Sequence, residues 1–288
     1  MKKFIAIIIC ALSMSVANAQ DTLFPYPVAP DTCSTLESRC DFIVIHFWDN
    51  FDLSKPIRDE QAFANAFADY VDFFKYADRS IVISAIRSFM FKAQANSGNF
   101  VKIGDVAERT LYGEDAVYWS DDAYLPFAQA LADSKQVKKE IRAHYAEQIN
   151  KIQKNQMEQD IPLTEWTGAD GSKHSISEVS ASEIIILLIT DDGMDSDMAR
   201  LRLSTDVNLN DMIAHGEVAV IDLTMGKYSG NWAAKAKSYP DNWIVGTSND
   251  IKKLLDVRIV PGAYILSKDK KILNKNVSVE SIKQAFSN

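Results

Sequence analysis

The sequence predicts two parts of different class: a mainly α-helical N-terminal half, and a C-terminal half of class α/β. From Arg58 to Lys154, apolar residues recur every three or four positions, which is the period of an amphipathic helix. After Met157, strand-like runs alternate with helical segments, a pattern typical of a three-layer α/β domain with at least one parallel strand pair. The run Ser182–Thr190 is almost continuously apolar, as expected for a strand buried on both faces of a sheet.

In the N-terminal half we expect an extended proline-rich lead, one strand and at least three helices. The β-branched and aromatic run Asp41–Trp48 favours a buried strand, with His46 as a hydrogen-bonded core residue. The helices are predicted from apolar residues that share a face: Phe63, Phe67, Val71 and Phe74; Ile83, Ile86 and Met90; and Val137, Ile141, Tyr145, Ile149 and Ile152.

The C-terminal half opens with a predicted hairpin, because Asp170–Gly171 favours a tight turn between Ile161–Trp166 and Lys173–Ile176. The elements expected next are, in chain order, strand Ser182–Thr190, a helix from Ser196, strand Val218–Leu223, helix Trp232–Ser238, strand Trp243–Val245, helix Asp250–Leu255, strand Ala263–Leu266, a strand from Ile272 and helix Ser278–Phe286. We place the two domains at residues 20–157 and 158–288.

This order of elements resembles thioredoxin-like domains of the TlpA (AhpC/TSA) type. The resemblance covers Ile161–Phe286, and its most specific part is Val257–Leu266, which looks like the family's cis-proline loop, at Val260 and Pro261, and the strand after it. It implies a central mixed sheet flanked by helices. The N-terminal half, through Phe47–Asp52, resembles a helical domain of unknown function that precedes such domains in proteins typical of Bacteroidota, and this implies no known activity.

The residues that carry the family's chemistry are missing. Thiol–disulfide exchange in the family needs a CxxC motif at the start of the helix after the apolar strand, where the helix dipole stabilises a thiolate. Here that start contains Met194, Asp195, Ser196 and Asp197, and alignment places Met194 and Asp197 at the two cysteine positions. Neither side chain can exchange disulfides, so the resemblance implies no catalytic residue here.

Two other functional interpretations of this half stay open beside simpler ones. Asp191, Asp192, Asp195 and Asp197 are oxygen donors that could bind Ca²⁺, although their spacing is not that of an EF-hand loop. As helix residues, Asp195 or Ser196 could cap the helix, and Asp197 would favour its dipole. Trp232 and Trp243 could form an aromatic binding surface or pack in the core.

The N-terminus predicts export. Lys2 and Lys3, an apolar run and Ala17-Asn18-Ala19 form a signal peptide at residues 1–19, with cleavage before Gln20 and a periplasmic or otherwise exported product. Cleavage takes the formal net charge from −8 to −10, because it removes two lysines. An acidic chain without a basic cluster is not expected to bind nucleic acid, and no later run is long enough to span a membrane.

Export leaves two cysteines, Cys33 and Cys40, in an oxidising compartment. We expect a structural disulfide between them, while free thiols or a redox-active pair remain alternatives. The sequence thus favours an exported, non-catalytic thioredoxin-like protein that binds a peptide or envelope protein at the cis-proline loop, without a metal or cofactor. The alternatives are a thiol–disulfide oxidoreductase that uses Cys33 and Cys40, and an enzyme that uses the acidic residues near Met194.

Overall fold

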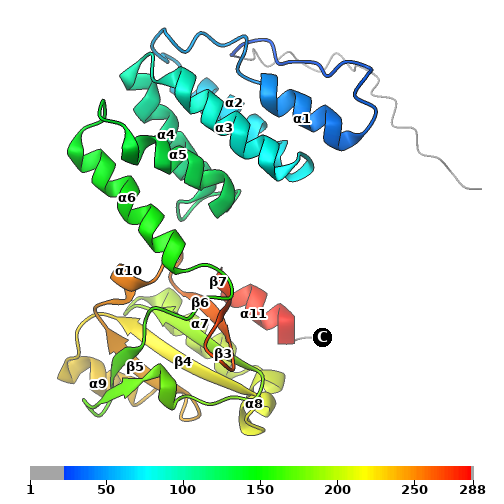
Figure 1. Cartoon of the computed structure of the whole chain (residues 1–288). Helices are drawn as coiled ribbons and strands as arrows, with labels where there is room; N and C mark the ends of the chain where they lie inside the picture. Colours follow the sequence, from blue (N-terminus) through cyan, green and yellow to red (C-terminus); the bar gives the residue numbers. More distant parts are fainter. Residues whose placement is uncertain (1–22, 287–288) are drawn as a thin grey trace, which may run out of the picture. The chain divides into compact units, whose positions relative to one another are not determined.

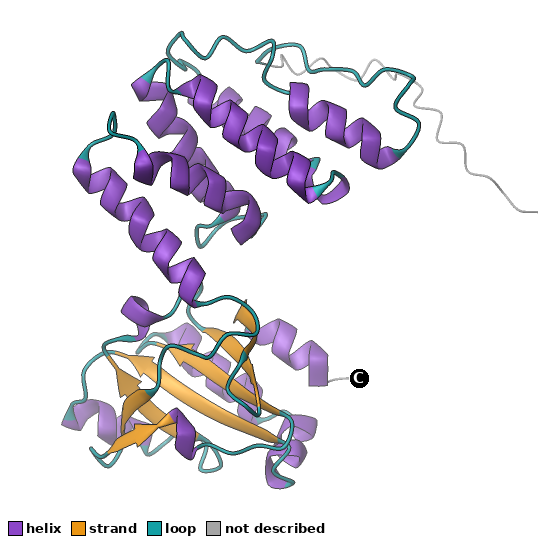
Figure 2. Cartoon of the chain, viewed as in Figure 1, coloured by secondary structure: helices purple, strands orange, loops and turns teal. Residues whose placement is uncertain are grey.

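The computed structural model describes residues 23–286, and Figure 1 labels most of its helices and strands. The chain divides into two compact units between Ala85 and Ile86. The predicted signal peptide and its cleavage site lie outside the described residues. Figure 2 shows that strands occur only in the C-terminal half. The N-terminal half is mainly helical, as the sequence predicts, but it lacks the one strand expected there within the described residues. No helix within residues 23–286 is long and apolar enough to cross a membrane.

The first unit is built around aromatic side chains. It contains α1 (Leu36–His46), α2 (Glu60–Asp72), the short 3-10 helix η1 (Phe74–Tyr76) and the start of α3 (Arg79–Ala93). The centroids of neighbouring rings lie about 5–6 Å apart, and the rings are tilted or edge-to-face, which are arrangements that aromatic pairs prefer. The buried rings of this core are Phe24, Phe47, Trp48, Phe63, Phe67 and Tyr70.

The strand predicted at Asp41–Trp48 is wrong, since most of this run lies in helix α1. Thr35 caps the helix by accepting a hydrogen bond from the Ser38 N–H, and the Ser38 side chain completes a capping box. The buried side chains of Cys40, Val44 and Phe47 recur at helical spacing and face the aromatic core. His46 is not a core residue: its side chain is 41% exposed, and its Nδ1 lies 2.7 Å from Asp49.

The structure has Cys33 and Cys40 as free thiols, with Cys33 half-buried and Cys40 buried in α1. Burial raises the pKa of the Cys40 thiol, and the neighbouring Asp41 carboxylate adds to this effect. The disulfide between the two cysteines therefore stays a prediction.

The second unit begins with the end of α3 and three more helices: α4 (Ser97–Leu111), α5 (Asp121–Asp133) and α6 (Lys139–Lys154). Asn96 caps α4 and Ser120 caps α5 through their side chains. α5 packs against both α4 and α6. The largest fully buried side chains of α4, α5 and α6 are Phe100, Ile103, Tyr124, Phe127 and Tyr145.

The same unit contains a seven-stranded mixed sheet in the order β2-β1-β5-β4-β3-β6-β7. β3, β4 and β5 are parallel, and the other pairs are antiparallel, which agrees with the predicted sheet. The strands are β1 (Glu165–Gly168), β2 (Lys173–Ser175), β3 (Ile184–Thr190), β4 (Val218–Met225), β5 (Ile244–Ser248), β6 (Gly262–Ser267) and β7 (Ile272–Val277).

Two hydrophobic clusters cover the sheet, because consecutive β3 side chains alternate between its faces. Ile185, Leu187 and Ile189 join one cluster, whereas Ile186 and Leu188 join the other. The flanking helices are α7 (Met194–Ser204), α8 (Val207–Ala214), α9 (Gly230–Ala236), α10 (Ile251–Leu254) and α11 (Val279–Phe286). The sequence predicts each of these helices except α8. Asp206 caps α8 through its side chain, and the Leu209 side chain of α8 is buried.

Candidate functional site

The start of α7 and the loop before β6 lie at the same end of the sheet. β3 ends at Thr190, and α7 begins four residues later. The antiparallel register of β3 and β6 pairs Ile189 with Gly262, so Pro261 lies beside the end of β3. The peptide bond between Val260 and Pro261 is cis, and both residues are half-buried.

Of the predicted site residues at the start of α7, Met194 faces solvent and Ser196 is buried. The Met194 side chain, on the first residue of the helix, is 78% exposed. The Ser196 hydroxyl donates to Asp191 Oδ1 at 2.6 Å and accepts from the Asp191 N–H at 3.0 Å. This hydrogen bond to Ser196 lowers the pKa of Asp191. The capping residue of α7 is Gly193, without a side-chain hydrogen bond, so the cap expected from Asp195 or Ser196 is not formed.

Asp197 connects the surface of α7 to a buried ion pair. One of its carboxylate oxygens lies 2.8 Å from Arg200 Nη1 and 3.1 Å from Lys235 Nζ. Arg200 is only 4% exposed, and its Nε donates to Asp222 Oδ2 at 2.6 Å. The Arg200 guanidinium also lies 4.1 Å from the centre of the Tyr239 ring, within the range of a cation–π contact.

Asp222, the partner of this arginine, is fully buried in β4. Burial raises the pKa of Asp222, and the positive charge of Arg200 offsets only part of that effect. The Thr190 hydroxyl donates to Asp222 at 2.7 Å, and Arg200 Nη2 donates to Thr190 and Thr224 at 2.6 and 3.2 Å. Arg200 and Asp222 were not among the predicted site residues. One signal could have found them: a carboxylate within the apolar run Val218–Leu223 requires a buried partner.

The four aspartates proposed as cation ligands do not converge on one point, and three of them have other partners. Asp191 binds Ser196 and the Gly193 N–H, whereas Asp197 binds Arg200 and Lys235. Asp192 lies 4.0 Å from Lys235. Within residues 23–286, no group of three or more His, Cys, Asp or Glu side chains is arranged to hold a metal ion.

The two tryptophans considered as a binding surface are core residues. Trp232 is 5% exposed and packs with Ala233, Ala236 and Tyr239. Trp243 is 7% exposed and belongs to the cluster beneath α7 and α8. Core packing is therefore the structural role of both side chains.

The loop before Pro261 is held by a second buried charge cluster. Asp256 is 1% exposed, and its Oδ2 lies 2.7 Å from Arg258 Nη2 and 2.6 Å from Lys275 Nζ. Burial alone would raise the pKa of Asp256, but the two cations outweigh it and the pKa lies below its usual range. Asp121, the first residue of α5, pairs with Arg258 and lies 2.8 Å from Lys275.

Neutral groups from the helices complete this cluster. The Tyr112 hydroxyl donates to Asp256 Oδ1 at 2.8 Å, and the Arg258 guanidinium lies 4.2 Å from the centre of the Tyr112 ring. Asn155 donates to the Leu254 carbonyl at 3.0 Å and accepts from the Tyr264 hydroxyl at 3.0 Å. Sequence reasoning missed this cluster, although Asp256 and Arg258 stand as isolated charges between apolar residues.

Beyond this cluster, the loop has free backbone groups. Arg258 N–H donates to Asn276 Oδ1 at 2.8 Å, but the N–H groups of Ile259 and Val260 donate to no other group within residues 23–286. Both residues are half-buried, so these donors can be satisfied by solvent or by a bound chain.

The lowered pKa of Asp256 gives a prediction for stability. A carboxylate with a lowered pKa in the folded state stabilises the protein above its unfolded pKa, near 3.8, and this contribution disappears as the pH falls through the folded pKa. Asp256→Asn should thus lower the free energy of unfolding by roughly 1–3 kcal/mol at neutral pH, because charged hydrogen bonds are lost. Urea unfolding at a series of pH values should show this difference shrinking below a pH of about 4.

The exposed Asp241→Asn is the matched control for Asp256→Asn, and should change the free energy of unfolding by less than about 0.5 kcal/mol. A difference between the wild type and Asp256→Asn that grows on acidification would contradict the assigned direction of the pKa shift.

Comparison with known proteins gives matches for both the helical N-terminal part and the α/β C-terminal part. The model of the family described as "Domain of unknown function (DUF5106)" matches residues 11–155. A crystal structure of a thioredoxin-like protein from Bacteroides caccae ATCC 43185 matches with a TM-score of 0.80 and 22% identity, over 92% of this chain and 98% of that one. No match was found among the curated proteins.

Two further solved structures match only part of the chain. The C-terminal domain of an uncharacterized protein from Bacteroides fragilis NCTC 9343 is 20% identical over 47% of this chain and 99% of that one, with a TM-score of 0.43. The thioredoxin domain of a thiol-disulfide oxidoreductase from Bacteroides vulgatus is 13% identical over 46% of this chain and 96% of that one, with a TM-score of 0.37. By the match of the family model to residues 11–155, the chain belongs to the DUF5106 family, and by its similarity to the Bacteroides caccae structure, a C-terminal domain of thioredoxin-like fold follows the helical N-terminal part.

Proposed function

We propose that this protein is an exported, non-catalytic thioredoxin-like protein that binds an extended peptide or a segment of an envelope protein at the loop Ile259–Pro261, the Pro261 loop. In this proposal residues 1–19 are removed as a signal peptide, residues 20–157 form the helical domain and residues 158–288 form the thioredoxin-like domain. One observation carries the proposal: the start of α7 contains no thiol, and the neighbouring loop has free backbone N–H groups.

The chemistry at the start of α7 argues against disulfide exchange. Exchange requires a thiolate, and the helix start presents the thioether of Met194 and the carboxylate of Asp197 instead. Asp197 is also engaged by Arg200 and Lys235. Cys40 is a poor alternative nucleophile, because it is buried and its thiol pKa is raised.

The neighbouring loop has features that suit peptide binding. An extended peptide can pair with free backbone N–H groups as an added strand does, and side-chain contacts then select its sequence. The N–H groups of Ile259 and Val260 supply the donors, and the half-buried Val260 side chain supplies an apolar contact. Met194 adds an exposed, flexible apolar side chain at the same end of the sheet, of the kind that adapts to varied ligands.

The substitution Val260→Asp tests this proposal. A charge at this position should weaken the binding of an apolar peptide by about tenfold or more, because the carboxylate would have to be desolvated against it. Binding is measured on an immobilised array of random nonapeptides, with thermal melting of each protein as a check on folding.

Val207→Asp is the matched control, since Val207 on α8 is 79% exposed. The control should bind the same peptides as the wild type. If Val260→Asp also binds the same peptides with unchanged affinity, the Pro261 loop is not the binding surface.

A further inference from the structure

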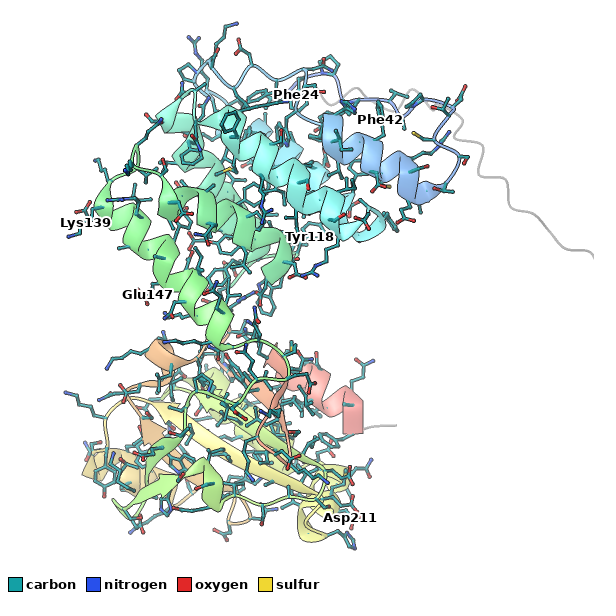
Figure 3. All side chains as sticks on the ribbon, viewed as in Figure 1. Phe24, Phe42, Tyr118, Lys139, Glu147 and Asp211 are labelled. Atoms are coloured by element: carbon teal, nitrogen blue, oxygen red, sulfur yellow. The ribbon has the colours of Figure 1, made fainter. Side chains whose placement is uncertain are left out.

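The connection between α4 and α5, residues 112–120, is fixed by its own hydrogen bonds. Trp119 Nε1 donates to the Gly113 carbonyl at 2.7 Å, and the Ser120 N–H donates to the Leu111 carbonyl at 3.1 Å. The Tyr118 N–H donates to the Thr110 carbonyl at 3.3 Å, and Figure 3 labels Tyr118 within this connection. The connection is therefore an ordered surface.

This ordered surface exposes apolar side chains. Val117 is 83% exposed and Trp119 is 38% exposed. The chain has five tryptophans, and the other four are at most 7% exposed, so Trp119 is the one tryptophan that solvent reaches readily. An exposed tryptophan on a rigid loop is typical of an interaction surface, where tryptophan is enriched among the residues that dominate affinity.

The connection is joined to the Pro261 loop at both of its ends. Tyr112 binds Asp256 and stacks on Arg258, while Asp121 pairs with Arg258 and Lys275. Trp119 precedes Asp121 by two residues, and Val260 follows Arg258 by two residues. An extended residue spans about 3.5 Å, so the Trp119 backbone lies within roughly 7 Å of the Asp121 backbone, and the Val260 backbone lies equally close to the Arg258 backbone. The two apolar surfaces therefore flank the same ion-paired cluster.

The charged residues of the connection itself are both acidic. Glu114 and Asp115, on the connection, are exposed and have no ion-pair partner within residues 23–286. At the start of α7, Asp195 is likewise exposed and unpaired within that range. The cations Arg258 and Lys275 are buried against Asp256 and Asp121, so they do not neutralise this surface. Complementary charge on a ligand would consequently be positive.

We propose that the α4–α5 connection forms a second wall of the binding surface at the Pro261 loop, with Val117 and Trp119 as its apolar contacts. The ligand is an extended apolar peptide segment flanked by lysine or arginine residues. This inference rests on the proposed function. It also gives the helical part of the chain a role, since that part contributes directly to ligand binding.

The test uses two labelled heptapeptides with the same Val-Ile-Val centre, one with two lysines at each end and one with two glutamates. The full mature protein should bind the lysine peptide with a Kd about tenfold or more below that of the glutamate peptide. Trp119→Ala should weaken binding of the lysine peptide by about tenfold. Bound peptide should also protect Trp119 from fluorescence quenching by acrylamide. Val117→Ser should weaken binding, whereas Val207→Ser, at the similarly exposed position on α8, should not.

The outcomes separate this inference from the proposed function. If Val260→Asp loses the lysine peptide and Trp119→Ala does not, the second wall is overturned and the proposed function stands. If Trp119→Ala loses the peptide and Val260→Asp does not, the proposed function is overturned, and this inference with it. Equal affinity for the two peptides, or binding of neither, would overturn the proposed ligand chemistry.

Discussion

Replacement of Arg200 by methionine is expected to lower the free energy of unfolding by about 3–5 kcal/mol, which is typical when one partner of a buried ion pair is removed. Arg200 is 4% exposed, and its guanidinium donates to Asp222, Asp197, Thr190 and Thr224. Methionine fills similar space but leaves the fully buried Asp222 carboxylate without a cation. Urea unfolding of the two proteins at neutral pH measures the loss.

The control for this substitution is Arg202→Met, two residues further along α7 on its exposed side. The Arg202 side chain is 51% exposed and pairs with Glu280 at the surface, so its loss should cost at most about 1 kcal/mol. The double substitution Arg200→Met/Asp222→Leu should recover much of the lost stability, because no charge is then left buried. Equal effects of Arg200→Met and Arg202→Met would show that Arg200 does not neutralise Asp222.

The second large effect is a gain of activity. Met194→Cys/Asp197→Cys is expected to introduce thiol–disulfide exchange, because the sequence predicts that these positions correspond to the redox cysteines of the thioredoxin-like domains that the chain resembles. A thiolate at position 194 would accept hydrogen bonds from the free N–H groups of the first helical turn, which lowers a thiol pKa. The position is also accessible, since Met194 is 78% exposed. Insulin reduction with dithiothreitol measures the gain.

A second cysteine pair at the same spacing is the control for this experiment. Val207→Cys/Asn210→Cys places two thiols at the first and fourth residues of α8, away from the end of β3. It should reduce insulin more slowly than the pair in α7. Absence of a disulfide between positions 194 and 197, in a protein that folds, would show that the alignment is wrong.

The sequence predicts the sheet well because its strands carry local signals. The apolar run at β3 can be satisfied only by burial on both faces, and the Asp170–Gly171 turn fixes the β1–β2 hairpin, where Gly171 has a φ of +85°. The position of the Pro261 loop beside β3 follows once β6 is paired with β3.

The parts that sequence reasoning missed depend on contacts between distant residues. The run Asp41–Trp48 has the residue types of a strand, but the Thr35 cap and packing of Phe47 and Trp48 in the aromatic core favour a helix. Arg200 and Asp222 are 22 residues apart, and Tyr112 and Asp256 are 144 apart. No local pattern joins such pairs, so their charges could be noted in the sequence but their partners could not be assigned.

Insulin reduction by the unmodified mature protein tests the central claim most directly. With dithiothreitol as reductant, the rate should equal the rate without protein, because the start of α7 contains no thiol. Turnover above that background would contradict a non-catalytic function. Its loss in Cys33→Ser would then assign the chemistry to Cys33 and Cys40 in the N-terminal part of the chain.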